Sequence, residues 1–205
     1  IRALADGKID LAVSARPPKP AEAARKVRVV LTLRTPFLLA TSSTKPPPLK
    51  TTDVLKMFTT DRPVWSDGAP VRIILRPRSE TDTRLLGNMT AGMEEAIQAA
   101  RQRGELPIAQ TDQANLAMAQ KMAGSLTGST LTQLTTEPNT LHTIAIDGVE
   151  PTLANLESGK YPFEKKLYFV LGEKSAPGAQ KFIAFLRSPQ GLKALRAAAV
   201  LPDKR

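Results

Sequence analysis

The chain has 205 residues, enough for one domain or for two small lobes. Hydrophobic residues make up 41% of the chain and charged residues 23%, which excludes a disordered or fibrous protein. The net charge of +10 would attract anions, but the basic residues are scattered and only 4% of residues are aromatic, so we expect no nucleic-acid partner. The absence of cysteine excludes a disulfide scaffold and leaves an oxidising compartment open.

The sequence begins inside a predicted helix. Ile1, Leu4 and Ala5 recur at helical spacing, and Asp6-Gly7 then ends the turn. No charged segment followed by an apolar one is visible, so no signal peptide is present in this chain, and we expect that upstream residues are missing. The longest apolar runs, such as 197–201, fall far short of the roughly 20 residues of a membrane-spanning helix, so no membrane insertion is expected.

Strands and helices are predicted to alternate along the chain. Short β-branched or apolar runs predict strands at 9–13, 27–33, 37–41, 71–75, 141–146 and 167–171. Capping residues followed by helical spacing predict helices from Thr51 or Thr52, at 82–103, 112–122 and 151–156, after Ser175, and from Ser188-Pro189 to about Ala199. This alternation predicts an α/β protein with largely parallel sheets.

Two further segments bear on the organisation of the chain. The polar, proline-rich stretch 41–48 predicts a linker and a first lobe boundary near Ser43. In the helix after Ser175, an apolar face is predicted from Phe182, Ile183, Phe185 and Leu186. The glycine- and serine-rich segment 124–129 is predicted to be too flexible for a helix and to lead into a short strand.

No catalytic constellation is present in the sequence. The only histidine, His142, is interpreted as packed or solvated, and a two-histidine metal site or a cysteine nucleophile is excluded. The segment 124–128 has its serine in the wrong place for a nucleophile elbow, and no P-loop follows a strand. We therefore expect that this chain is not an enzyme and that it binds neither a metal ion nor a cofactor.

The segment 76–83 (RPRSETDT) is a cationic, hydroxyl-rich turn between a predicted strand and a predicted helix. An arginine fork, hydroxyl donors and the first N–H groups of a helix can together bind an oxyanion. The alternative is ordinary capping of the helix by Ser79 or Thr81, with Arg76 in solvent. The residues alone leave both interpretations open.

Segments along the whole chain resemble the phosphate-type solute-binding proteins of bacterial ABC importers. Residues 65–83 (WSDGAPVRIILRPRSETDT) are similar to that family's W-x-D-G, strand and R…S-G-T segment. The C-terminal third (AIDGVEPTLANLESGKYPFEKKLYFVLG, then FIAFLRSPQGLKAL, then AAAVLP) resembles its return segment, and residues 3–17 (ALADGKIDLAVSARP) resemble its l-x-x-G-x-i-D-x-a-x-S strand. The resemblance implies a two-lobe α/β periplasmic binding protein-like fold of type II, with the first strand and ligand loop of lobe one missing.

Carried over position by position, the resemblance implies five anion ligands. Arg76, Ser79 and Thr81 would lie on the second lobe, and Ser14 with Arg16 on the first. The chain departs from the pattern where Glu80 replaces a glycine and where Ala15 replaces the aspartate that accepts a proton from hydrogen phosphate. The second departure leaves open which oxyanion is bound.

The resemblance also implies an organisation and a role. Lobe one would comprise residues 1–43 plus 161–205, and lobe two the inserted residues 44–160, with a hinge at the two crossings. Residues 37–41 and 167–171 are then expected in the same lobe. The implied role is a periplasmic, non-enzymatic binding protein whose partners are a small anionic solute and an ABC permease in the inner membrane. The alternative is a solute-sensing or scaffold protein on the same fold without a transport role.

Overall fold

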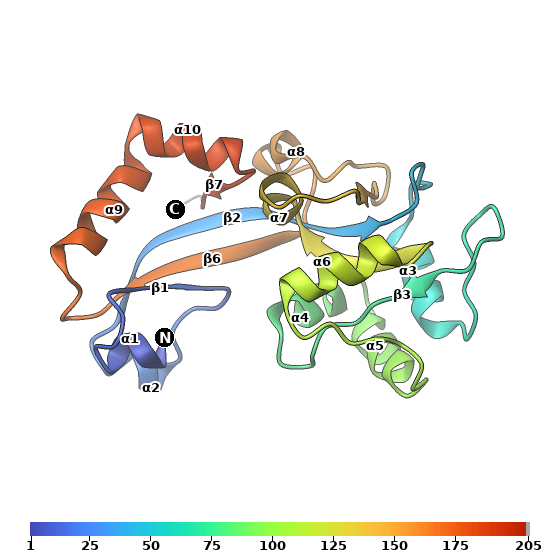
Figure 1. Cartoon of the computed structure of the whole chain (residues 1–205), viewed down its shortest axis with the longest axis horizontal. Helices are drawn as coiled ribbons and strands as arrows, with labels where there is room; N and C mark the ends of the chain where they lie inside the picture. Colours follow the sequence, from blue (N-terminus) through green and yellow to red (C-terminus); the bar gives the residue numbers. More distant parts are fainter. Residues whose placement is uncertain (204–205) are drawn as a thin grey trace. The chain divides into compact units, whose positions relative to one another are not determined.

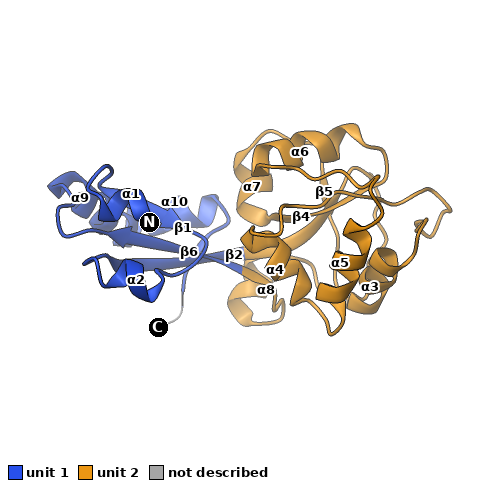
Figure 2. Cartoon of the chain, turned by 90° about the horizontal axis from the view of Figure 1, so that it is seen from below, with its two compact units in different colours: residues 1–35, 165–205 blue, residues 36–164 orange. Residues whose placement is uncertain are grey.

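The computed structural model describes residues 1–203 and divides the chain into two compact units. Unit 1 comprises Ile1–Thr35 and Lys165–Arg205 as a division of the chain, and unit 2 comprises Pro36–Glu164 (Figure 2). The chain therefore passes from one unit to the other within the long strand β2 (Arg28–Thr41) and returns at the start of β6 (Glu164–Leu171). Both units combine strands with helices, which confirms the predicted α/β class.

Unit 1 is a small sheet covered by short helices. Its strands run in the order β1 (Leu11–Ser14), β6 and β2, and β7 (Leu201–Pro202) also pairs with β2. The register places Leu11 opposite Leu171 and Ser14 opposite Tyr168. The helices are α1 (Arg2–Ala5), α2 (Pro20–Ala23), α9 (Pro177–Arg187) and α10 (Pro189–Ala197), as Figure 1 shows.

The core of unit 1 forms between the sheet and helix α9. Leu33 of β2 and Phe169 of β6 pack with Ile183 and Leu186 of the helix. Each such buried side chain contributes roughly 1.5–3 kcal/mol. The predicted apolar face of this helix is wrong in part, because Phe182 and Phe185 are 45% and 47% exposed. Ile183 and Leu186 are three positions apart and share one narrow face, which the sheet covers.

Unit 2 is the larger unit. The second half of β2 pairs with both β4 (Ser125–Thr130) and β5 (His142–Thr143), and β3 (Arg72–Ile73) lies beyond β4 at the edge. Its helices are α3 (Thr51–Thr59), α4 (Thr81–Gly87), α5 (Met93–Arg101), α6 (Asp112–Lys121), α7 (Leu131–Thr136) and α8 (Leu153–Ser158). Its core joins the sheet to α3 and α5 through fully buried residues: Phe37, Leu39, Ile73, Met93, Ile97, Leu126 and Ile144.

The prediction of largely parallel sheets is wrong. Strands β1 and β6 are antiparallel, as are the pairs that β2 forms with β4, β5 and β7, whereas β3 and β4 are parallel. Alternation of elements implies parallel strands only when successive strands are neighbours. Here β2 takes its partners from distant parts of the chain, so the order of elements along the sequence does not set the strand directions.

Two element predictions also need correction. The helix predicted at 82–103 is two helices, because Gly92 has φ +80° and such a left-handed residue cannot continue an α-helix. The segment 124–129 is not helical, as predicted, but most of it forms the buried strand β4 itself rather than a flexible lead into a strand. Its small side chains allow close packing, and the space beside Gly128 is filled by the Phe37 ring.

The unit boundaries separate two segments that were expected together. Residues 37–41 belong to unit 2, while residues 167–171 belong to unit 1, so that expectation is not met. The reason is that β2 is one continuous strand of 14 residues, and the division falls inside it rather than at the proline-rich stretch after it.

None of the helices in residues 1–203 has the length and apolar character that a membrane crossing requires.

Candidate functional site

Arg76 follows the edge strand of unit 2 and is buried. The strand continues past β3 to Leu75, which bridges to Ile108, and Arg76 comes next with 6% exposure. One terminal nitrogen of its guanidinium donates to the Ala109 carbonyl oxygen at 2.5 Å, and the other lies 2.7 Å from Oδ1 of Asp112. The structure thus shows a fixed guanidinium, which differs from the solvated Arg76 of the capping interpretation.

The predicted hydroxyl residues lie in the turn that leads into α4. Ser79 is exposed in the turn, and Thr81 is the first residue of the helix, whose N-cap is Glu80. No side chain caps this helix with a hydrogen bond, so the capping role considered for Ser79 and Thr81 is not seen. The hydroxyl of Thr83 instead donates to the Arg76 and Pro77 carbonyl oxygens at 3.2 and 2.9 Å, which fixes the turn against the helix.

A second arginine, which the sequence did not indicate, joins this turn. Arg101, at the end of α5, donates to the Arg76 carbonyl oxygen and, at 3.4 Å, to Oγ1 of Thr83. Burial and, to a lesser degree, the positive charge of Arg78 hold the pKa of Arg101 below its ordinary value. Within the described residues no carboxylate forms an ion pair with Arg101. In the sequence, Arg101 is recognisable only as a basic residue in the last turn of an amphipathic helix. Such residues are common, so the pattern does not point to a binding site.

The two arginines enclose a small internal space. It has a volume of about 10 Å³, is lined by Arg76, Asp82, Thr83 and Arg101, and can hold one water molecule at most. The Nε atoms of both arginines are buried without a hydrogen-bond partner among the described residues. A tetrahedral oxyanion does not fit inside this space, so only the exposed side of the turn, at Arg78 and Ser79, is open to one.

The other two predicted ligands lie together in unit 1. Ser14 ends β1, and its Oγ accepts a hydrogen bond from the backbone N–H of Arg16 at 3.3 Å. The guanidinium of Arg16 binds both carboxylate oxygens of Glu22, at 2.7 and 2.9 Å, and the Pro17 carbonyl oxygen. The hydrogen bonds from Arg16 and from the Lys19 backbone lower the pKa of Glu22 to about 2. Arg16 is therefore already paired within its own unit.

The predicted residues thus form two groups. Arg76, Ser79 and Thr81 share one turn of unit 2, and Ser14 and Arg16 share one turn of unit 1. Thr83, in the segment 76–83, also belongs to the first group. Arg101 and Asp112 belong to it as well and were missed, because residues 25 and 36 positions from Arg76 in the sequence carry no local pattern that joins them to it.

Comparison with known proteins identifies the family. The PBP superfamily domain matches residues 1–190. The chain belongs to the PBP superfamily. No curated protein matches it significantly.

Solved structures agree with this family. A putative phosphate ABC transporter substrate-binding protein from Clostridium perfringens, with bound phosphate, has a TM-score of 0.77 at 15% identity and covers 99% of this chain and 83% of its own. A phosphate-binding protein from Stenotrophomonas maltophilia has a TM-score of 0.68 at 13% identity, over 99% of this chain and 81% of its own. The similarity extends to the LysR family transcriptional regulator CbnR, with a TM-score of 0.51 at 16% identity, covering 96% of this chain and 55% of its own. At these identities the similarity establishes the periplasmic binding protein fold.

Proposed function

We propose that this chain is the solute-binding component of an ABC importer and binds a small oxyanion, phosphate or a related one. The observation that carries the proposal is the match of the whole fold to proteins described as phosphate-binding. The turn of Arg76, Ser79 and Thr81, which the sequence resemblance implies as the ligand turn, supports it. In this proposal the two lobes correspond to units 1 and 2, and Ser14 and Arg16 are the residues of unit 1 that the resemblance implies.

The charges around the turn support an anionic ligand. Arg76 is partly balanced by Asp112 at 2.7 Å and by Glu80 at 3.9 Å, but Arg101 has no such carboxylate and Arg78 adds a further positive charge. A bound anion would offset the burial and the nearby positive charge of Arg78 that lower the pKa of Arg101. An oxyanion on the exposed side of the turn would receive hydrogen bonds from Ser79 and Thr81. The positive charges of Arg76 and Arg101 would add electrostatic attraction.

The residues in unit 1 bear on which oxyanion is preferred. Ala15, between Ser14 and Arg16, has no carboxylate that could accept a proton from hydrogen phosphate. A site without such an acceptor does not penalise sulfate, which carries no proton at neutral pH. We therefore propose that the selectivity for phosphate over sulfate is weak.

The remaining parts of the proposal follow from the role. The ligand is a small anionic solute, the partner is an ABC permease in the inner membrane, and the protein acts in the periplasm without catalysis or a cofactor. The similar solved structures described as substrate-binding proteins of ABC transporters support this assignment. A sensor on the same fold is the second candidate, and the similarity to the regulator CbnR favours it.

Calorimetric titration of the chain with phosphate, sulfate and molybdate tests the proposal. Arg76→Lys and Arg101→Gln should each weaken binding about tenfold or more, because each removes a charge-assisted donor or its fixed geometry. Arg84→Gln is the matched control, since Arg84 is exposed on α4 and outside the turn. Equal affinities in all three variants would contradict the site. Co-purification with a permease, rather than with a regulator, separates importer from sensor.

A further inference from the structure

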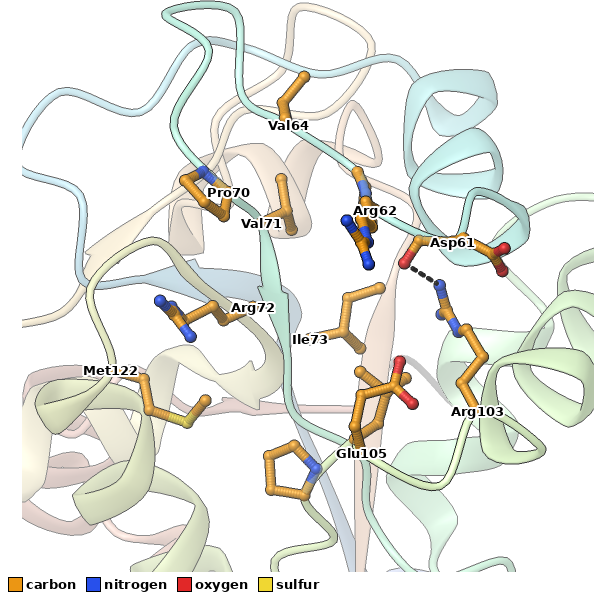
Figure 3. A pocket seen from close by; sticks show the side chains of 13 residues that line it. Asp61, Arg62, Val64, Pro70, Val71, Arg72, Ile73, Arg103, Glu105 and Met122 are labelled. Carbon is orange, nitrogen blue, oxygen red and sulfur yellow. Dashed lines mark hydrogen bonds between the residues drawn. The ribbon is translucent and has the colours of Figure 1, made fainter.

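Unit 2 contains a cavity that shares no residue with the proposed oxyanion site. It has a volume of about 790 Å³ and lies beside the outer edge of β3, between the segments 61–64 and 103–107 (Figure 3). This volume is within the range of pockets that bind small organic molecules. All of its lining residues belong to unit 2.

Most backbone N–H groups of the edge strand beside this cavity are already hydrogen-bonded. The N–H groups of Arg72 and Ile74 donate inward to β4, at Gly124 and Leu126. On the outer edge, Val71 donates to the Pro63 carbonyl oxygen at 2.8 Å and Leu75 to that of Pro107 at 2.9 Å.

The outward-facing backbone groups at Val71 and Leu75 are therefore already hydrogen-bonded. Between them, only Ile73 presents its backbone edge to the cavity. A peptide that adds to a sheet as a further strand pairs with several residues along the edge, and here only one residue has its outer edge free. The geometry thus favours a compact ligand over an extended peptide.

The walls combine apolar side chains with unpaired cations. Val64, Pro70, Leu106 and Met122 supply apolar surface. In Figure 3 the side chain of Arg62 reaches down toward Ile73, and that of Arg72 lies on the opposite side beside Met122. Neither Arg62 nor Arg72 has a side-chain hydrogen bond or ion pair within the described residues.

The third arginine of the cavity has a structural role. Arg103 donates to the carbonyl oxygen of Phe58, in the last turn of α3, and to those of Thr60 and Asp61, which follow the helix. These bonds hold one wall in place. Among the acidic lining residues, Glu105 points toward the centre of the cavity, so the charges that face the space are two arginines and one carboxylate (Figure 3).

We propose that this cavity is a second ligand site, which binds a small organic monocarboxylate with an apolar body. The carboxylate is held by Arg62 and Arg72, and the apolar part lies against Val64, Pro70 and Met122. Two arginines and the single carboxylate of Glu105 face the space, which leaves one net positive charge. This charge favours an anion over a neutral molecule or a zwitterion. This proposal does not rest on the oxyanion site.

The probe for the test is 4-methylpentanoate, compared with its neutral amide and with leucine, which adds an ammonium group to the same skeleton. Calorimetry should show saturable binding of the carboxylate, with the amide at least about tenfold weaker, because it lacks the charge. Arg62→Gln and Arg72→Gln should each weaken binding about tenfold, while Glu105→Gln strengthens it about threefold. The amide resonance of Ile73 should shift on binding.

Arg84→Gln again serves as the matched control and should leave the affinity for 4-methylpentanoate unchanged. Three results would overturn the proposal. These are no saturation up to about 20 mM, a loss in Arg62→Gln and Arg72→Gln no greater than in the control, and tighter binding of leucine that Glu105→Gln weakens. Circular dichroism of each variant confirms that a loss of binding is not a loss of folding.

Discussion

Arg76 and Asp112 form an ion pair of 2.7 Å in which the arginine is 6% exposed and the carboxylate side chain 45% exposed. The pair joins the end of the edge strand to the first residue of α6, so it fixes the turn at which we place the oxyanion. It also places a negative charge near the proposed anion, with which it competes for the positive charge of Arg76.

Removal of this competitor should strengthen anion binding. Asp112→Asn keeps the shape and a hydrogen-bond acceptor but removes a negative charge near the turn, so sulfate affinity should rise by roughly three- to tenfold at low salt. Glu95→Gln, an exposed change on α5, is the control for net charge. An affinity that is equal in the two variants would show that the ligand does not bind near Arg76.

Gly191 should not tolerate a side chain. A Cβ atom there would lie 2.0 Å from the Phe185 carbonyl oxygen and 2.7 Å from the Leu186 Cα, and both are backbone atoms at the junction of α9 and α10. Gly191→Ala should therefore destabilise the protein by about 2–4 kcal/mol, as overpacking and backbone displacement do. The close approach explains the glycine that follows Ser188-Pro189 in the sequence.

The matched control is Gly178→Ala, in α9, where a Cβ would meet no atom within 4 Å. This change should leave stability unchanged or raise it by at most about 1 kcal/mol, because alanine favours a helix. Urea denaturation of both variants measures the difference. Equal midpoints would mean that α9 and α10 are not packed as described.

The hydroxyl of Tyr161 should contribute to stability. It donates a hydrogen bond of 2.9 Å to the Phe37 carbonyl oxygen, and the ring is 1% exposed. Tyr161→Phe leaves that oxygen without this donor and should cost about 1–2 kcal/mol. Tyr168→Phe, a half-buried tyrosine without such a bond, should cost about 0.5 kcal/mol or less. A larger loss in the second variant would contradict the assignment.

Tyr161 also predicts a loss of stability at alkaline pH. Burial, and secondarily the negative charge of Glu150, raise the pKa of this phenol above its ordinary value of 10.0. A group whose pKa is raised on folding contributes fully below its unfolded pKa, so its contribution is lost as the pH rises above about 10. Absorbance titration should show this tyrosine ionising only well above pH 10, and Tyr161→Phe should remove that step.

Glu22 predicts an opposite dependence at acid pH. Its pKa falls from 4.5 to about 2 when Arg16 binds it, so the contribution is present above pH 4.5 and is lost as the pH falls toward 2. Carbon-detected titration should find this carboxyl at about 2, and Arg16→Gln should return it toward 4.5. A carboxyl that titrates at 4.5 in the unmodified chain would show that Arg16 is not paired.

The sequence predicts local features of the fold better than the long-range ones. Ser188-Pro189 correctly marks the start of α10, where Ser188 is the N-cap, because capping depends only on neighbouring residues. The start of α3 at Thr51 is as expected, but its N-cap is Lys50 and not one of the two threonines. The directions of the strands that pair with β2 depend on segments more than eighty residues away, and no periodicity encodes them. Exposed Phe182 and Phe185 show the same limit, since helical spacing does not reveal how wide a face the sheet covers.

The same distinction applies to the site. The motif around Arg76 was visible because its residues are contiguous, and its position at the start of α4 is as expected. Arg101 and Asp112 come from other helices and meet Arg76 only through the fold of unit 2. The pairing of Arg16 with Glu22 was missed although the two are close in sequence, because it depends on the turn at residues 17–19 and on the short helix α2, which was not predicted.

The most direct test of the oxyanion proposal is a titration of the 15N-labelled chain with sulfate and with phosphate at constant ionic strength. We expect saturable, one-to-one binding in which the backbone amides of Ser79 and Thr81 shift together, with the two anions of similar affinity and Arg84→Gln without effect. Linear, non-saturating shifts spread over the basic surface would contradict the proposal. Such a result would mean that the chain has the binding-protein fold without an oxyanion site at Arg76.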